Sequence, residues 1–224
     1  MLSHKEILQY LSDLDEPHAK FVYISKSKSK ESLITALIED VLASDSLPSS
    51  EKGKRLEVLV DNLLKYAGVF ASVRKNLKDD KGDMDHTFSL IPHIWNEIDP
   101  EIIEDHGCRG VGESKNHPED KITVSIIYKL EALKALSDIK IGCYFTRRGS
   151  TGDSSSKAGK AVIRGFMLKN KSISIVFSDK DWSFLKNHPS YFSALFYEKL
   201  CYMRHDKDSE NVDFKELEKF CSQQ

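Results

Sequence analysis

Residues 109–146, RGVGESKNHPEDKITVSIIYKLEALKALSDIKIGCYFT, decide the fold class that we expect for this chain. The opening RGVGESK, residues 109–115, is typical of a short strand, and residues 117–137 have the length and apolar content of a long helix. The apolar run IKIGCYFT, residues 139–146, is typical of a buried strand. We therefore expect strands to alternate with helices in this part of the chain.

The same alternation continues on both sides of this segment. Two more helices are predicted by apolar periodicity, at residues 54–68, where Gly68 is the expected stop, and at residues 157–169. Three more strands are predicted, at residues 69–77, 83–91 and 172–178. Residues 91–107 are ambiguous and are expected to hold a short strand or a turn of helix. The resulting order predicts an α/β domain whose sheet has helices on both faces.

Both ends of the chain are expected to be mainly helical. Residues 20–25, KFVYIS, read as a short strand, whereas residues 33–42 carry one apolar stripe of an amphipathic helix. The Pro, Ser and Gly residues at positions 44–54 then interrupt the pattern. We therefore divide the chain into a helical extension at 1–49, a core at 50–187 and a helical extension at 188–224.

Composition narrows the functional classes. The chain has 224 residues, of which 40% are hydrophobic and 30% charged, and its formal net charge of −2 neither requires nor excludes a nucleic-acid partner. No apolar run approaches the roughly 18 residues that span a bilayer, so we expect no membrane partner. The mixed charges of the first sixteen residues are not those of a signal peptide, and we expect a cytoplasmic protein.

Four cysteines, at positions 108, 143, 201 and 221, are widely spaced and form no C-x-x-C pair. This spacing argues against a zinc ribbon and against a disulfide framework, so we expect reduced thiols. His106, Cys108 and His117 lie close in the sequence, but their spacing matches no structural zinc pattern.

Charged residues on two predicted strands suggest a catalytic site. Side chains alternate along a strand, so Glu113 and Lys115 project to one face while Ser114 points away. Asp85 lies on the preceding strand, and Asp83 is the alternative ligand if the strand register shifts by two. Two carboxylates and the Ser114 carbonyl offer oxygen ligands to a hard cation such as Mg²⁺. The alternative is an ordinary solvated ion pair.

The ordered set of a helix, DMDHTF, GESKN, a helix and IKIGCYFT resembles the PD-(D/E)xK nuclease superfamily, and within it the Mrr-like restriction endonucleases. The resemblance covers residues 51–185 and implies a restriction-endonuclease-like core with a mixed central sheet flanked by helices. It implies a magnesium-dependent endodeoxyribonuclease, with Mn²⁺ as a substitute ion. Asp85 and Glu113 correspond to the metal ligands and Lys115 to the water-orienting lysine, and Glu57 corresponds to an assisting glutamate on the first helix.

Two departures from the family pattern affect the expected structure. Asp85 and Glu113 lie 113 − 85 = 28 positions apart, which is long for a direct hairpin, so residues between the two strands must form an excursion. Met84 occupies the position of the usual proline before the aspartate.

Basic residues after the strand at 139–146 suggest a nucleic-acid contact. Arg147, Arg148 and Lys157 lie in or next to the polar loop RRGSTGDSSS, and we expect them to touch a DNA backbone. SKSKSK at 25–30 and KGKR at 52–55 are further candidates. Cutting two strands requires two active sites, so a homodimer is expected, with apolar stripes of the terminal helices, including 191–203, as interfaces.

Two other functions remain open. The core could be a catalytically inactive nuclease-fold module that binds nucleic acid or a partner protein, or it could be a nuclease directed at RNA. His86, next to Asp85, is expected to point to the opposite strand face and to pack there.

Overall fold

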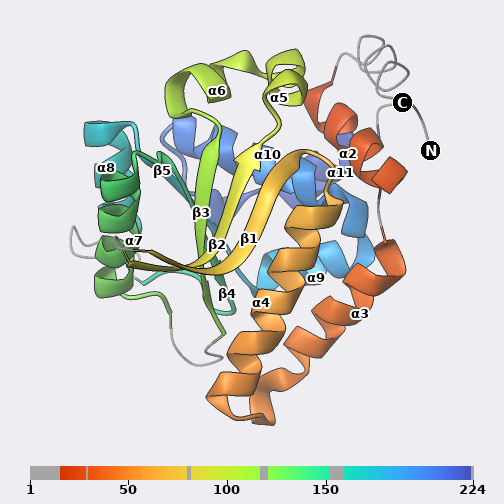
Figure 1. The fold of residues 1–224 in the computed structure, drawn as a ribbon. Coiled ribbons are helices and arrows are strands. Elements are labelled where there is room, and N and C mark those ends of the chain that lie inside the picture. The colour runs from red at the N-terminus through yellow and green to blue at the C-terminus, as the bar shows by residue number, and fades with distance from the viewer. Residues whose placement is uncertain (1–15, 29, 80–81, 117–120, 152–158, 223–224) are drawn as a thin grey trace.

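The computed structural model describes residues 16–28, 30–79, 82–116, 121–151 and 159–222. Its centre is a five-stranded sheet in the order β1-β2-β3-β4-β5, which Figure 1 shows from one edge. The strands are β1 (Phe70–Asp79), β2 (Gly82–Leu90), β3 (Arg109–Lys115), β4 (Ile141–Thr146) and β5 (Ile173–Phe177). The β1–β2 and β2–β3 pairs are antiparallel, whereas β3–β4 and β4–β5 are parallel, so the sheet is mixed as expected.

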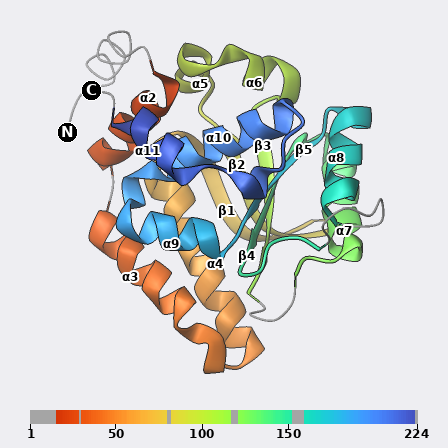
Figure 2. The same ribbon diagram turned by 180° about the vertical axis from the view of Figure 1, so that it is seen from behind.

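Helices surround this sheet. They are α2 (Pro17–Lys28), α3 (Glu31–Leu42), α4 (Ser49–Tyr66), α5 (Pro92–Ile98), α6 (Pro100–His106), α7 (Val124–Ser137), α8 (Gly159–Asn170), α9 (Asp179–Asn187), α10 (Phe192–Arg204) and α11 (Phe214–Cys221). Helices α7 and α8 cover one face of the sheet, and α4, α9 and α10 cover the other (Figures 1 and 2). We call these the α7 face and the α4 face. The predicted helices on both faces are thus confirmed.

An aromatic cluster fills the α4 face because alternate strand residues point into it. Phe88 of β2 and Phe177 of β5 meet Phe196 of α10, with ring centroids 5.9 and 6.3 Å away. Phe145 of β4 stacks on Phe177 at 5.2 Å. Aromatic contacts of this kind fix the sheet against α10 in addition to the burial of apolar area.

The β1–β2 hairpin does not stay in the plane of the sheet. Its register shifts between Ala71 and Arg74, with Ser72 at φ 51°, and such a bulge bends and twists a strand. The hairpin sweeps across to α7 (Figure 1), where a Cβ at Gly82 would lie 2.7 Å from the Leu133 side chain. Gly82 has φ 139°, so a larger residue would be both strained and obstructed there.

The five strands predicted for the core are confirmed with small shifts at their ends, and the excursion between β2 and β3 consists of the two helices α5 and α6. Two predictions about local structure are wrong. Residues 20–25 belong to helix α2, because Phe21, Ile24 and Ser25 pack at helical spacing in the core beside α10. Helix α7 begins only at Val124, since Ile122 pairs with Ser150 in a β-bridge.

The predicted boundaries fall at ends of elements, but the terminal extensions are not separate from the core. Ser25 Oγ donates to Ala67 O at 3.0 Å and contacts Ser193 Oγ at 2.9 Å, which ties α2 to α4 and α10. The apolar stripe of α10, including Phe192 and Leu200, is at most 2% exposed. This stripe is used inside the chain, so the prediction that 191–203 offers it as a dimer interface is wrong.

None of the helices in the described ranges combines the length and the apolar composition needed to cross a membrane.

Candidate active site

Strands β2 and β3 bring Asp85 and Glu113 together where the two strands separate. Their last registered pair at this end is His86 with Gly112, so Asp85 and Glu113 occupy the next positions. Asp85 Oδ2 accepts a hydrogen bond of 2.8 Å from the backbone N–H of Ser114. The carboxylate thus takes the place of a backbone acceptor as the hairpin leaves the sheet. This register keeps Asp85 as the candidate ligand. The exposed Asp83 instead lies opposite Lys78 of β1 in the strand register, near the tip of the hairpin.

Glu113 is the most buried carboxylate of this site, with 1% of its side chain exposed. Its Oε1 lies 2.7 Å from Lys115 Nζ and 3.3 Å from Lys129 Nζ. Its Oε2 is buried and has no hydrogen-bond partner among the described residues. A buried carboxylate oxygen without a partner is costly, so this atom is the natural attachment point for a cation.

The charge of Lys115 is set by three acidic neighbours. Burial by itself lowers the pKa of Lys115, but the hydrogen bond and charge of Glu113 raise it, and the charges of Asp85 and Glu57 add to this effect. The net result is a raised pKa, so the ammonium stays protonated at neutral pH. The sequence-predicted group of four residues is therefore close enough in space to interact electrostatically.

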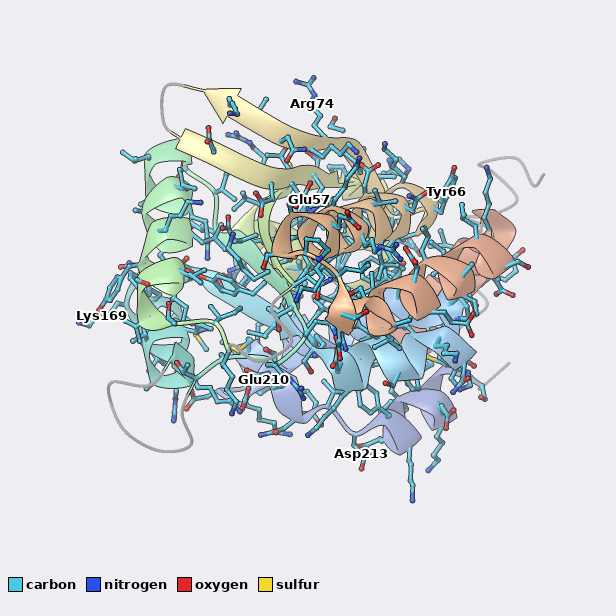
Figure 3. All side chains as sticks on the ribbon, turned by 90° about the horizontal axis from the view of Figure 1, so that it is seen from below. Glu57, Tyr66, Arg74, Lys169, Glu210 and Asp213 are labelled. Carbon is cyan, nitrogen blue, oxygen red and sulfur yellow. The ribbon has the colours of Figure 1, made fainter. Side chains whose placement is uncertain are left out.

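Glu57 approaches the site from α4. Figure 3 shows it on this helix, beneath the β1–β2 hairpin. Its Oε2 lies 3.5 Å from Asn76 Nδ2 of β1, at the limit of a hydrogen bond. Glu57 is half-buried and is held less firmly than Glu113, which suits an assisting residue better than a primary ligand.

Lys129 is a residue of this site that the sequence analysis missed. It lies on α7, 16 positions after Glu113, and half of its side chain is exposed. Nothing distinguishes it from the other lysines of an amphipathic helix in the sequence. Only the packing of α7 on the sheet places its ammonium beside Glu113.

The donor set fits a hard cation with few protein ligands. Within the described part of the chain, no three His, Cys, Asp or Glu side chains gather as a metal-binding group. A magnesium ion does not need three, because it commonly keeps several waters and uses one or two carboxylates. Glu113 Oε2, the free oxygen of Asp85 and the Ser114 carbonyl would serve as its ligands.

A second layer supports the site from the α4 face. His86 Nε2 contacts Ser114 Oγ at 2.8 Å, and the ring stands edge-on to Phe145 at 5.9 Å. The predicted position of His86 on the opposite strand face is confirmed. Burial lowers the pKa of His86 to about 4, although the charges of Asp61 and Glu113 act in the opposite direction. His86 is therefore neutral at pH 7 and holds β2 against β3 behind Asp85.

Neutral burial of His86 predicts a pH-dependent stability. The folded-state pKa of about 4 lies below the ordinary value of 6.5, so stability is complete above pH 6.5 and falls as the pH drops towards 4. We expect His86 to account for a loss of about 3 kcal/mol over this interval. Urea unfolding of the wild type and of His86→Gln at several pH values measures the difference.

The exposed His205 provides a control, because His205→Gln should keep the wild-type pH dependence. Equal slopes for the wild type and His86→Gln would show that this imidazole is not responsible.

Arg147 has a structural function in the fold that competes with the DNA contact predicted for it. Only 5% of its side chain is exposed, and Nη1 donates to Val41 O and to Asp45 Oδ1, both at 2.9 Å. Its Nε also pairs with Asp179. This guanidinium ties the end of β4 to α3 and α9, and little of it is open to a phosphate. The burial argues against the DNA contact predicted for Arg147, which stays a prediction.

Replacing Arg147 is expected to lower stability and leave DNA affinity unchanged. For Arg147→Gln we expect a loss of about 2–3 kcal/mol in the free energy of unfolding. The value is below that of a fully buried ion pair because 57% of the Asp45 side chain is exposed. Urea unfolding and fluorescence anisotropy with labelled DNA test the two parts. If Arg147→Gln instead binds DNA more weakly and is as stable as the wild type, Arg147 does contact a phosphate.

The other basic candidates have different outcomes. Arg148 is exposed, Lys157 lies outside the described residues, and the side chains at 26–29 are not described. In KGKR, Lys52 Nζ donates to Asp45 O at 3.4 Å and Arg55 pairs with Asp40. The zinc alternative gains no support from His106, whose Nδ1 lies 3.0 Å from Lys171 O, and His117 is also outside the described residues.

Comparisons with known proteins found no relative of this chain. The chain matches no family model, no curated protein and no solved structure.

Proposed function

We propose that this protein is a magnesium-dependent endodeoxyribonuclease with a restriction-endonuclease-like core. The observation that carries the proposal is the convergence of Asp85, Glu113 and Lys115 where β2 and β3 separate, with a buried, unpartnered oxygen on Glu113. The order of a helix, an antiparallel β1–β2–β3 unit, a crossover helix and a parallel strand agrees with the family resemblance of the sequence. Mn²⁺ is expected to substitute for Mg²⁺.

Each residue has a defined task in this proposal. Asp85 and Glu113 hold the cation, which when bound would lower the pKa of water and neutralise charge on a phosphodiester. The Ser114 N–H orients Asp85, and Glu57 faces the same space from α4. Lys115 stays protonated, so it donates hydrogen bonds to the attacking water or to a phosphate oxygen. Lys129 supplies a second positive charge beside Glu113.

One observation favours the alternative of a nuclease-fold module that binds nucleic acid without cutting it. Two ammonium groups already surround Glu113 Oε1, and together they neutralise the charge that a cation would otherwise meet. Metal titration by calorimetry separates the two functions. A non-cutting module should show no magnesium-linked heat that depends on Asp85.

The proposal is tested with supercoiled plasmid DNA and a matched RNA substrate. We expect the wild type to nick or linearise the plasmid with magnesium and to leave it intact with EDTA. Lys115→Ala should be at least about a hundredfold slower, because a positioned proton donor contributes this much or more. Lys180→Ala, an exposed change on α9, should match the wild type. Equal cleavage by Lys115→Ala would contradict the assignment.

A further inference from the structure

A polar pocket lies on the sheet, away from the carboxylates of Asp85 and Glu113. Its volume is about 250 Å³. Its lining comes from the bulged part of β1, from β2, from the start of β3 and from the end of α7, and consists of Ser72, Arg74, Leu77, Met84, Thr87, Phe88, Ser89, Arg109, Gly110, Ser137 and Ile139. Two arginines and four hydroxyl groups line it, and none of its described lining residues is acidic.

The arginines of this pocket differ from four others in the described part of the chain. Arg55, Arg147, Arg164 and Arg204 each pair with at least one carboxylate. Arg74 and Arg109 have no such partner among the described residues, and both are exposed. Figure 3 shows Arg74 extending from β1 into solvent. Two unneutralised guanidinium groups at one pocket create a local positive potential that attracts anions.

Arg109 is also oriented by the fold. Its Nη1 donates to the backbone carbonyl of Ser137 at 3.2 Å, at the carboxyl end of α7. The bond fixes one nitrogen of the planar fork, and the remaining donors stay available. Arginine forks of this kind match the geometry of phosphate oxygens.

The hydroxyl groups provide an independent indication of a ligand. Ser137 is only 5% exposed, yet its Oγ has no hydrogen-bond partner among the described residues. A buried hydroxyl without a partner in a native protein calls for an explanation, and a ligand is one of the few available. The hydroxyls of Ser72, Thr87 and Ser89 also line the pocket and are at least partly exposed, so they can donate to a bound anion.

From these features we infer that the pocket binds a phosphate group. Guanidinium and hydroxyl groups supply donors, and the absence of a lining carboxylate removes the usual repulsion of an anion. The volume is below that of typical drug-sized sites and suits a phosphate with part of its ester. The phosphate belongs either to a free nucleotide or to a nucleic-acid backbone, because both present the same oxygens.

The pocket and the candidate active site use the same two strands. Thr87 is two positions from Asp85 on β2, and Arg109 is four positions from Glu113 on β3, so alternation places these side chains on one face. The four positions between Arg109 and Glu113 correspond to about 13 Å along the strand. The nucleic-acid source rests on the proposed function, whereas the free-nucleotide source does not.

The experiment measures binding without metal, so it does not depend on cleavage. Calorimetry in EDTA compares inorganic phosphate, adenosine 5′-monophosphate and a single-stranded oligonucleotide, each with the wild type, Arg74→Gln, Arg109→Gln and Ser137→Ala. We expect each arginine variant to bind about tenfold more weakly, the usual order for a lost arginine–phosphate contact. Lys78→Gln is the matched control, because Lys78 is exposed on β1 and does not line the pocket.

The pattern across ligands identifies the source. Weaker binding of phosphate and the mononucleotide supports a small-ligand site, and weaker binding of the oligonucleotide alone supports a backbone site. Ser137→Ala should weaken the same ligand while thermal stability stays unchanged, since the hydroxyl has no partner to lose. Binding of all three ligands that is unaffected by either arginine variant would overturn the inference. A failure of plasmid cleavage would contradict the proposed nuclease function but not the phosphate pocket, because the binding is measured without metal.

Discussion

Replacing Glu113 with glutamine is expected to reduce DNA cleavage at least about a hundredfold, equivalent to about 2.7 kcal/mol of transition-state stabilisation. Glutamine keeps the shape of the side chain but removes the charge of the buried carboxylate whose Oε2 has no partner. Asp85→Asn should have a similar effect for the same reason. Plasmid cleavage at saturating magnesium gives the rates, and calorimetry with Mn²⁺ shows whether the loss arises in metal binding.

Stability must be followed in the same variants, because Glu113 also pairs with Lys115 and Lys129. Lys115 and Lys129 have 32% and 50% of their side chains exposed, so water solvates part of each ammonium group when the carboxylate is lost. A folded Glu113→Gln protein that cleaves at the wild-type rate would remove the site from consideration. Wild-type affinity for Mn²⁺ in Asp85→Asn would exclude Asp85 as a ligand.

Glu131→Gln is expected to cause the largest loss of stability, about 3–5 kcal/mol, because it removes one partner of a buried ion pair. Glu131 and Lys134 are 2% and 1% exposed, with 3.0 Å between Oε1 and Nζ. Burial lowers the pKa of Lys134, whereas the charge of Glu131 raises it, and the lowering prevails. Without Glu131 the ammonium would lose its only charged partner among the described residues.

The matched control is the double variant Glu131→Gln with Lys134→Met. It removes the buried charge altogether, and apolar replacement of a buried pair is often close to neutral, so much of the stability should return. Urea unfolding at pH 7 measures all three proteins. A loss below about 1 kcal/mol for Glu131→Gln would show that water reaches this cluster.

The pairing of residues across the sheet could be anticipated from local patterns for one reason. Strand periodicity sets which side chains share a face, so Glu113 and Lys115 were expected together. Asp85 was expected beside them on the neighbouring strand. The observed register of β2 and β3 brings the three charged groups close enough to interact. Apolar runs such as 141–146 and 173–177 identified strands that are buried throughout, because full burial on both faces leaves few alternatives to aliphatic and aromatic residues.

Contacts between distant segments could not be anticipated in this way. Residues 20–25 have the composition of a strand but form a helix, because contacts with α10 outweigh a weak local preference. Arg147 follows a strand like any loop arginine, yet α3 and α9 bury it. Gly142 looks like a break in β4, but its missing side chain makes room for Lys134, whose Cδ would lie 3.0 Å from a Cβ there.

The sequence by itself determined the alternation of helices and strands and the shared face of Glu113 and Lys115, since each depends on spacing along a single strand or helix. The mixed sheet and the place of Asp85 beside Glu113 depend on how strands pair, and they were expected from the family resemblance. Only the tertiary structure decided the place of Lys129, the burial of Arg147 and the pocket between Arg74, Arg109 and Ser137. These features depend on how the hairpin bends and how α7 packs on the sheet, and such packing is the sum of many contacts between residues far apart in the chain.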